Sequence, residues 1–479
     1  MPDVRVSLSE VLEEGSVVME LARAFQDRGH ELYVVGGIVR DALLGGAGDV
    51  DLTTDAPPEV TKAIVEPRAE AVWLQGIRFG TVGCRIGDWN MEITTFRSER
   101  YEPDSRHPEV NFEASIESDL ARRDFTVNAM AIRLPDRAAV DLFDGRGDLE
   151  RRILRTPIDP HESFTDDPLR MLRAFRFASQ LEFQIAPEVL ETITELREKL
   201  LTVSAERIRD ELSRLLVGAA PAAALGLADS TGITDLFLPE LGALKLEQDP
   251  VQKHKDVFKH TLAVLQRTEP HLEVRLAALL HDIAKPKTRK IGPEGVSFHH
   301  HEVEGAKMAR ARLRALRYPN DVVDKVGDLI FLHHRFHTYS LGWTDSAVRR
   351  YVRDAGPLLG ELNALVRADC TTRNPNRARR LAARMDELEA RIAELAEREE
   401  FERFRQPDLD GTQIMAYLGV PPSRVIGEAR EFLIERRLDE GPLSEDAAYA
   451  ALDAWARERG IEPVGERSPP KPRKEKEAE

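Results

Sequence analysis

The amino-acid sequence predicts an α+β protein, in which a mixed sheet with helices over about residues 1–150 is followed by all-α domains. Two observations lead to this prediction. Short apolar runs bounded by glycine or polar turns recur up to about residue 142, as is typical of strands. From about residue 155, strand patterns nearly vanish and apolar residues recur at spacings of three and four, which indicates amphipathic helices.

The composition places the chain among globular proteins of several domains. Its 479 residues are enough for about three or four domains. No run of about 18 apolar residues is present, and the first residues lack the apolar segment of a signal peptide. Only two cysteines, Cys84 and Cys370, occur in this long chain, which favours free thiols in a reducing compartment. We therefore expect a cytoplasmic protein without a membrane partner.

The predicted strands lie in order along the N-terminal region. Leu32–Val35 leads into Gly36 and Gly37, which is the pattern of a strand and a turn. The further predicted strands are Val50–Thr53, Phe79–Ile86, Met91–Thr95, Ala129–Leu134 and Ala139–Leu142. The polar turns Gly87–Asn90 and Pro135–Arg137 join the last four of these strands into two hairpins.

The region after about residue 155 is predicted to be helical to about residue 460. The clearest amphipathic helices are Leu169–Leu181, Ala186–Leu201 and Ala205–Val217. The last segment, Arg467–Glu479, is dominated by Pro, Lys and Glu and has no apolar residue except alanine. A segment of this composition cannot bury an apolar core, so we expect a disordered tail.

Asp49 and Asp51 form the pattern Asp-x-Asp on a predicted strand. Residues i and i+2 of a strand project to the same face, so the two carboxylates lie together. Mg²⁺ prefers oxygen ligands and commonly bridges carboxylates to the phosphates of a substrate. Upstream, the Gly36-Gly37 turn lets backbone N–H groups approach a phosphate closely. Each pattern alone is common in solvated turns, but together, with Arg40 between them, they indicate a metal-dependent nucleotidyl-transfer site.

Further motifs carry a resemblance to a known family. The run Gly36–Asp55 resembles the nucleotidyltransferase signature of class II tRNA nucleotidyltransferases (CCA-adding enzymes) and bacterial poly(A) polymerases. Arg122–Ala131 resembles the second motif of that family, and Asp141–Gly147 resembles the third. Asp166–Phe177 resembles the fourth motif and Ala205–Glu211 the fifth. The motifs follow the family order over about 200 residues, so chance is a poor explanation.

The resemblance implies a role for each matching residue. Asp49 and Asp51 would bind catalytic Mg²⁺, and Glu92 on the strand Met91–Thr95 is a weaker candidate for a third catalytic carboxylate. The nucleotide-binding residues would be Gly36, Gly37, Arg40, Arg122, Asp124, Asn128, Asp167, Arg170, Arg173 and Arg176. The partners implied by the family are CTP, ATP and the 3′ acceptor end of tRNA.

Asp167 and Arg170 would form a template that reads the Watson–Crick edge of CTP or ATP. A carboxylate accepts from an exocyclic amine, and arginine donates to ring nitrogen or carbonyl acceptors. Both bases offer an amine beside an acceptor, so one pair of side chains can serve both. The family motif usually opens with Glu-Asp, and Asp166 departs from that pattern. The alternative for Asp167 and Arg170 is an ordinary i, i+3 salt bridge on a helix.

The choice between CCA addition and polyadenylation depends on two segments. Poly(A) polymerases typically carry an Arg-rich signature where this chain has Leu74–Val82, which resembles the CCA-adding version. Phe96–Pro108 resembles the flexible loop associated with addition of the final A, and a surface loop without that role is the alternative. The formal net charge of −16 mildly disfavours an enzyme that grips arbitrary RNA. We expect CCA addition, with poly(A) polymerase as the alternative.

A second set of candidate ligands, rich in histidine, follows residue 250. It resembles the ligand pattern of the HD phosphohydrolase superfamily, which implies that one metal is held by His260, His281, Asp282 and Asp369. His301 and either His333 or His334 are candidates for a second metal. Imidazole and carboxylate ligands on neighbouring helices suit Mn²⁺, Ni²⁺, Fe²⁺ or Zn²⁺.

The resemblance to HD proteins implies hydrolysis of a phosphate ester. Some CCA-adding enzymes carry such a domain and show phosphatase or 2′,3′-cyclic phosphodiesterase activity. A metal there would polarise a phosphate and activate water for attack. The alternative is a metal-binding helical domain without useful turnover.

The resemblance also divides the chain into five parts. They are a nucleotidyltransferase catalytic domain (1–150), a helical nucleotide-recognition or neck domain (151–250), an HD phosphohydrolase domain (251–375), a helical C-terminal tRNA-binding region (376–465) and the tail (466–479). In residues 376–405, arginines followed by glutamates fit either a solvated helix or a basic stripe that faces RNA, and both interpretations stay open. Leu409–Val420 resembles a short helix found late in HD-bearing members.

Overall fold

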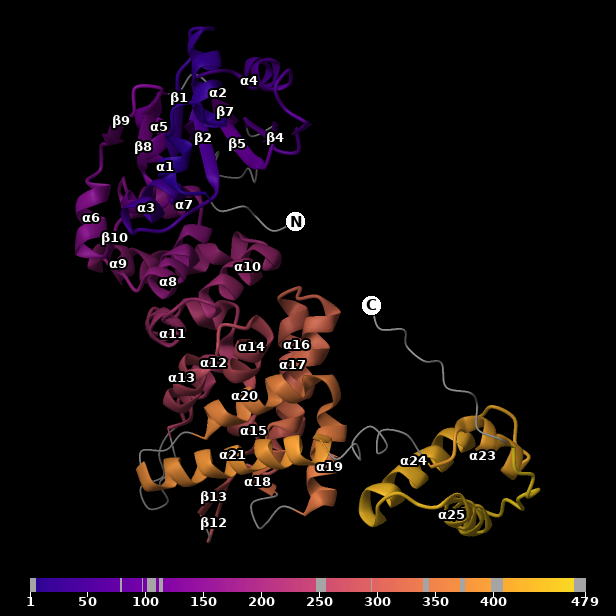
Figure 1. Cartoon of the computed structure of the whole chain (residues 1–479). Helices are drawn as coiled ribbons and strands as arrows, with labels where there is room; N and C mark the ends of the chain where they lie inside the picture. The colour runs from indigo at the N-terminus through magenta and orange to yellow at the C-terminus, as the bar shows by residue number, and fades with distance from the viewer. Residues whose placement is uncertain are drawn as a thin grey trace. The chain divides into compact units, whose positions relative to one another are not determined.

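The chain folds into two compact units in the computed structural model, which is drawn in Figure 1. The residues that it describes are 6–77, 80–96, 98–100, 109–111, 115–246, 256–293, 295–338, 344–370, 375–397 and 408–468. The first unit comprises Met1–Gln266, Pro270–Arg275 and Ala311–Asn320. The second comprises Arg267–Glu269, Leu276–Arg310 and Asp321–Glu479. Two short segments that follow residue 266 in sequence therefore complete the first unit.

A seven-stranded sheet forms the centre of the N-terminal part of the first unit (Figure 1). Its strands, in spatial order, are β3 (Ala71–Trp73), β4 (Thr81–Ile86), β5 (Trp89–Thr95), β2 (Val50–Thr54), β1 (Leu32–Val35), β8 (Met130–Leu134) and β9 (Ala138–Asp141). Strands β2 and β5 run parallel, and each other adjacent pair is antiparallel. The predicted mixed sheet is thus confirmed.

Strand β1 is buried on both faces of this sheet, because all four of its residues are buried. Side chains alternate along a strand, so neighbouring residues enter different cores. Leu32 packs in the core that also contains residues of helices α2 (Val17–Gln26) and α4 (Pro58–Val65). Tyr33 packs in a second core with residues of α5 (Ile116–Ala121). The loops at the end of β1 are therefore held by packing on two sides.

The six predicted strands are all present, and their ends differ from the predicted ends by at most two residues among those described. The sequence did not predict β3 or the short strand pairs. These pairs are β6 (Ser98–Arg100) with β7 (Glu109–Asn111), β10 (Ile153–Leu154) with β11 (Gln184–Ile185), and β12 (Lys290–Gly292) with β13 (Gly295–Ser297). Strands of two or three residues carry too little periodicity to be recognised.

Helices make up the remainder of the first unit. The short ones are α1 (Leu8–Val11), α3 (Gly37–Leu43), η2 (Thr126–Asn128), α6 (Gly145–Arg151), η4 (Ile233–Leu236) and α12 (Pro239–Ala243). The longer ones after the sheet are α7 (Pro160–Asp166), α8 (Leu169–Leu181), α9 (Pro187–Leu196), α10 (Ala205–Leu216), α11 (Pro221–Ser230) and α13 (Val257–Arg267). The predicted helix Ala186–Leu201 was wrong in one respect, because α9 ends at Leu196 and continues as the 3-10 helix η3 (Arg197–Thr202).

The second unit is helical except for the hairpin β12–β13. Its helices are α15 (Lys285–Thr288), α16 (His301–Ala315), α17 (Asn320–Leu332), α18 (Arg335–Thr338), α19 (Asp345–Ala355), η5 (Gly356–Leu358), α20 (Leu359–Asp369), α21 (Pro375–Glu397), α23 (Gly411–Leu418), α24 (Arg424–Glu440) and α25 (Glu445–Glu458). Helix α14 (Leu272–Leu280) and helix α16 each contribute residues to both units. Within the described residues, no helix has the length and apolar character needed to span a bilayer.

Candidate functional sites

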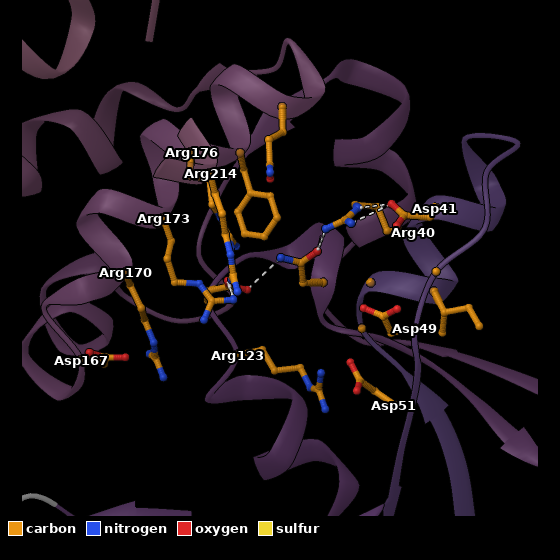
Figure 2. A pocket seen from close by; sticks show the side chains of 18 of the residues that line it. Arg40, Asp41, Asp49, Asp51, Arg123, Asp167, Arg170, Arg173, Arg176 and Arg214 are labelled. Carbon is orange, nitrogen blue, oxygen red and sulfur yellow. Dashed lines mark hydrogen bonds and ion pairs between the residues drawn. The ribbon is translucent and has the colours of Figure 1, made fainter. Parts of the chain in front are cut away.

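A polar pocket in the first unit collects most of the residues that the sequence singles out (Figure 2). Its cavity volume is about 740 Å³. The lining residues are Gly36, Gly37, Ile38, Arg40, Asp41, Gly48, Asp49, Asp51, Arg122, Arg123, Asp124, Asn128, Asp167, Arg170, Arg173, Arg176, Phe177, Gln180 and Arg214. They include seven arginines and five aspartates, so the pocket is cationic in a chain whose net charge is −16. The whole-chain charge is thus no guide to the charge of this pocket.

The carboxylates Asp49 and Asp51 lie at the start of β2, where the strand adjoins β1. Val50 between them is buried and both aspartates are exposed to the pocket, as expected for residues i and i+2. Glu92 on β5 stands opposite Asp51 in the parallel β2–β5 register, although it does not line the pocket. Loss of surrounding water at the pocket wall raises the pKa of Asp51 to about 6; Arg123 opposes that rise, while Glu92 and Asp49 add to it. Repulsion of this kind is relieved when a cation binds between carboxylates.

Gly36 forms the turn between β1 and α3, and its backbone conformation and close contacts explain why this position needs a glycine. Its φ is +76°, a left-handed conformation that residues with a side chain rarely adopt. A Cβ atom at Gly36 would lie 2.9 Å from Nη1 of Arg123. The absence of a side chain therefore lets the Arg123 guanidinium approach the turn closely, beside Asp51.

A chain of polar contacts connects Arg40 on α3 to Arg173 on α8. Arg40 Nη1 donates to Asn128 Oδ1 at 2.6 Å, and Asn128 Nδ2 donates to Asp124 Oδ1 at 2.9 Å. Arg173 Nη2 lies 2.6 Å from Asp124 Oδ2. Burial by itself would raise the pKa of Asp124, but Arg173, Asn128 and Arg176 outweigh it and hold that pKa below its usual range. Asp124 is therefore an ionised carboxylate that orients residues from two parts of the unit.

Asp167 and Arg170 lie where α7 meets α8, and each has other partners. Asp167 accepts from the N–H of Leu169 at 3.2 Å and pairs with Arg207 of α10 at 3.1 Å. Arg170 donates to Ser163 Oγ at 2.9 Å and to the backbone carbonyl of Arg122. Their side chains do not pair with each other, so the alternative of an i, i+3 salt bridge between them is wrong.

Helix α10 supplies further residues to this region. Glu211 pairs with Arg176 at 3.1 Å, and both side chains are buried. Burial lowers the pKa of Arg176 to about 10 and raises the pKa of Glu211, although each residue favours the charged form of the other.

Sequence reasoning missed Arg123 and Arg214 as residues that line the pocket. Arg123 stands directly after the chosen Arg122; both arginines line the pocket and both pair with Asp119, Arg122 at 2.7 Å and Arg123 at 3.3 Å.

A second cluster, in the second unit, consists of histidines and aspartates from four helices. His281 and Asp282 follow α14, His301 begins α16, His333 follows α17 and Asp369 ends α20. The Nδ1 atoms of three histidines contact backbone carbonyls: His281 to Ala278 at 2.8 Å, His301 to Phe298 at 2.8 Å and His333 to Ile330 at 2.5 Å. A carbonyl oxygen only accepts, so each Nδ1 donates to it, and the Nε2 atoms are the ring nitrogens that a metal would use.

Asp282 lies between these histidines. Its Oδ2 is 3.2 Å from His281 Nε2, and its Oδ1 is 3.7 Å from His301 Nε2. Ligand atoms of Asp282, His301 and His333 lie within 4.8 Å of one another, and Asp369 Oδ1 is 3.8 Å from His281 Nε2. Burial, with the nearby charge of His281, lowers the pKa of His333 to about 3 and burial also lowers that of His301, so both rings are neutral at pH 7. Neutral imidazoles beside carboxylates fit a transition metal.

The remaining histidines of the predicted set are His260 and His334. His260 is buried on α13 in the first unit, and its assignment as a ligand stays a prediction. His334 is half-buried, with its ring centroid 5.1 Å from that of His301. His333 belongs to the group of ligand atoms described above, which favours it over His334 as the second-metal ligand.

Three family models match successive parts of the chain. They are a poly A polymerase head domain over residues 32–155, a probable RNA and SrmB-binding site of polymerase A over residues 182–244, and an HD domain over residues 257–401. The chain is 33% identical over 441 residues to the A-adding tRNA nucleotidyltransferase of Deinococcus radiodurans, which covers 89% of this chain and 95% of that protein. It is 41% identical over 234 residues to the CCA-adding enzyme of Levilactobacillus brevis, and this alignment spans 48% of the chain and 56% of that relative.

The fold has solved relatives as well. The structure titled as the Bacillus stearothermophilus CCA-adding enzyme in complex with CTP matches with a TM-score of 0.68 and 27% identity, over 92% of this chain and 97% of that one. The head, RNA-binding and HD parts therefore define a multidomain nucleotidyltransferase. The chain belongs to the class II family of CCA-adding enzymes and poly(A) polymerases, and the resemblance seen in the sequence is confirmed.

Proposed function

We propose that this chain adds C, C and A to the 3′ end of tRNA, using CTP and ATP and releasing pyrophosphate. The observation that carries the proposal is the pocket of Figure 2, with Asp49 and Asp51 on one side and Asp167 and Arg170 on another. A nucleoside triphosphate spans the two sides, with its phosphates at the first pair and its base at the second. The cavity of about 740 Å³ lies in the size range of small-molecule sites.

In the transfer step, the 3′-hydroxyl of the tRNA attacks the α-phosphorus, and the bond to pyrophosphate breaks. Asp49 and Asp51 would hold Mg²⁺, which would supply positive charge to the attacking oxygen and to the leaving group. Arg123, beside Asp51 and against the Gly36 turn, offsets negative charge on the phosphates. Arg40 is held in place by Asn128, so its guanidinium needs little ordering when the nucleotide binds.

The selection of C and A follows from the donors and acceptors at Asp167 and Arg170. Contacts with Arg207 and Ser163 hold the two side chains at the pocket wall. The carboxylate accepts from the exocyclic amine of C or A, and the guanidinium donates to the neighbouring ring nitrogen. U and G present a carbonyl oxygen in place of that amine. If that carbonyl faced the carboxylate, two hydrogen-bond acceptors would lie opposite each other with no donor between them. This disfavours UTP and GTP.

A narrower reaction, addition of the terminal A alone, is the second candidate. The relative that aligns over nearly its whole length is titled an A-adding tRNA nucleotidyltransferase. The sequence segment that we connect with the final A, Phe96–Pro108, lies mostly outside the described residues. The full CCA reaction remains our proposal because a CCA-adding enzyme is 41% identical to this chain over 234 residues. The resemblance of Leu74–Val82 to the CCA-adding version argues only against a poly(A) polymerase.

The test is nucleotide addition to three RNAs with CTP, ATP and Mg²⁺. The RNAs are a tRNA without its CCA end, the same tRNA ending in CC, and an unstructured RNA of equal length. CCA addition predicts three nucleotides on the first, one A on the second and little on the third. Extension of only the second indicates an A-adding enzyme, and a long A tail on the third with CTP ignored indicates a poly(A) polymerase; either result overturns the proposal.

We further propose that the histidine cluster hydrolyses phosphate esters, with a 2′,3′-cyclic phosphate as the model substrate. Asp282 presents one oxygen toward His281 and the other toward His301, so it would hold metal together with these histidines. A metal bound there would polarise a phosphate and activate water. His260 is the further ligand that the sequence pattern assigns. The domain boundaries near 150, 250, 375 and 465 belong to the same proposal.

His281→Ala tests the hydrolytic site. We expect metal-dependent hydrolysis of a cyclic phosphate to fall at least about a hundredfold, while CTP addition to tRNA continues, because His281 does not line the transfer pocket. Metal analysis should find two ions per wild-type chain and fewer in the variant. His161→Ala, an exposed histidine of α7, is the matched control. Unchanged hydrolysis or unchanged metal content in His281→Ala contradicts the assignment.

A further inference from the structure

One arginine of the transfer pocket differs from the other six in its contacts. Arg40, Arg122, Arg123, Arg170, Arg173 and Arg176 each bond or pair with a protein acceptor. Arg214 on α10 is exposed and has no hydrogen-bond or ion-pair partner among the described residues, yet it lines the same pocket. Gln180 on α8 also lines the pocket without such a partner within the described part of the chain. We call these two residues the α8–α10 rim.

The charge around this rim is not balanced by the protein. The cations Arg173, Arg176 and Arg214 influence one another, and the buried carboxylates Asp124 and Glu211 are fewer by one. Arg214 adds to the repulsion that lowers the pKa of the buried Arg176. An excess cation next to a cavity favours an anionic ligand, and a guanidinium with unused donors is suited to a phosphate.

Helix α10 holds Arg214 at a defined place, because residues next to Arg214 in the sequence are held by contacts with other segments. Ser213 Oγ contacts the Tyr318 hydroxyl at 2.8 Å, and Arg275 Nη1 donates to the carbonyl of Gly218 at 2.6 Å, just after the helix. Helix α8, which carries Gln180, packs against α10. A pre-positioned side chain loses less entropy when it binds.

The proposed function already assigns a ligand to each of two other sides of the transfer pocket. Asp49 and Asp51 take the triphosphate, and Asp167 takes the base. Figure 2 shows Arg214 beside Arg176, on a different side of the pocket from each of these. The growing RNA end must also enter the pocket, because its 3′-hydroxyl has to reach the α-phosphorus. The α8–α10 rim is the side left for it.

We propose that Arg214, with Gln180, binds a backbone phosphate of the acceptor RNA end and so positions the 3′-hydroxyl. This inference rests on the proposed function. It assigns to the rim a ligand chemistry, a phosphodiester of single-stranded RNA, that is distinct from the triphosphate of the incoming nucleotide.

The test uses the full chain with Arg214→Gln, CTP and a tRNA that lacks its CCA end. The KM for tRNA should rise on the order of tenfold, with a smaller effect on kcat, because a charge-assisted hydrogen bond is lost. The logarithm of tRNA affinity should depend on the logarithm of salt concentration with a slope shallower by about 0.7, the value for one single-strand phosphate contact. CTP affinity measured without tRNA should not change.

Two controls separate the possible outcomes. Arg214→Lys keeps the charge and should retain the salt slope, and Arg133→Gln, an ion-paired arginine of β8 outside the pocket, should change neither constant. A loss of CTP affinity without tRNA means that Arg214 touches the nucleotide, and no change in KM means that it is a solvated arginine; both overturn the inference. If the wild-type protein adds no nucleotide at all, the proposed function fails instead.

Discussion

At the residue scale, the two sites depend on polar side chains that other polar side chains hold in place. Asp124 connects Asn128 and Arg173, and each histidine of the second cluster is oriented by a backbone carbonyl. Such secondary contacts set the orientation of the groups that meet substrate or metal. Substitution of a residue that contacts the ligand should therefore lower the reaction rate, whereas substitution of a residue that orients such side chains should also lower stability.

Asp51→Asn tests a residue that meets the ligand. We expect the single-turnover rate of CTP addition to fall at least about a hundredfold, because the amide cannot supply the second negative charge to Mg²⁺. The melting temperature should not fall, because the change removes the repulsion among Asp51, Asp49 and Glu92. Asp88→Asn, in the exposed β4–β5 turn, is the control. A variant that keeps the wild-type rate shows that Asp51 is not a metal ligand.

Asp124→Asn tests an orienting residue through pH. The folded pKa of Asp124 lies below its unfolded value, so its contribution to stability is present above about pH 4 and is lost as pH falls through the folded pKa. At pH 7 the variant should lose about 1–3 kcal/mol of unfolding free energy, because the half-buried Arg173 loses its charged hydrogen-bond partner. Below about pH 4 its stability should depend less on pH than that of the wild type.

The measurement is urea unfolding between pH 3 and pH 7. Asp136→Asn, which breaks the exposed pair with Arg133, serves as the control and should change the free energy of unfolding much less than Asp124→Asn does. If Asp124→Asn shows the same acid dependence as the wild type, then Asp124 is not ionised in the folded protein.

At the scale of elements, α10 connects several parts of the pocket wall. Its start pairs with Asp167 through Arg207, its middle pairs with Arg176 through Glu211, and its end is held by Arg275. The sequence predicted this helix and α8 to within one residue at each end, because both are amphipathic and bounded by capping or Pro residues. It did not predict these cross-helix pairs, since each joins residues far apart in the chain.

The Arg176–Glu211 pair leads to a prediction about stability. Glu211→Leu should lower the free energy of unfolding by about 3–5 kcal/mol, because Arg176 would remain buried without its carboxylate. The double variant Arg176→Met/Glu211→Leu should be more stable than the single variant, because burial already disfavours both charges. A double-mutant cycle by chemical unfolding measures the coupling. Additive effects would mean that the pair does not interact.

At the scale of the whole molecule, segments beyond residue 266 complete the first unit. Arg312 Nε lies 3.0 Å from both carboxylate oxygens of Glu240, Arg209 Nη1 donates to the Arg317 carbonyl at 2.7 Å, and Tyr318 contacts Ser213. Helices α10 and α12 are therefore stabilised by segments that include parts of α14 and α16, two helices that also adjoin or carry residues of the histidine cluster.

A truncation experiment follows from this organisation. A chain that ends at residue 246 loses Arg275, Arg312 and Tyr318, so we expect faster amide exchange in α10 and reduced CTP addition. A chain that ends at residue 397 keeps these residues and should retain slow exchange in α10. Hydrogen exchange followed by mass spectrometry measures both. Equal protection of α10 in the two truncated chains would contradict the prediction.

Much of the fold and part of the candidate site can be predicted from local sequence patterns alone. The α+β class, six strands, helices α8 and α10, and the pair Asp49 and Asp51 all follow from period, spacing and residue type within short segments. The histidine set follows from its resemblance to the HD superfamily. The family follows from the order of the motifs. These features are recognisable because each depends on residues that are close together in the chain.

The tertiary structure decided which polar residues meet. It placed Arg123 and Arg214 in the pocket, left Asp167 and Arg170 unpaired with each other, and favoured His333 over His334. The physical reason is that ion pairs and ligand sets join residues tens to hundreds of positions apart, so neither hydrophobic period nor motif spacing encodes them. Their geometry follows only when the cores around β1 and α8 bring the segments together.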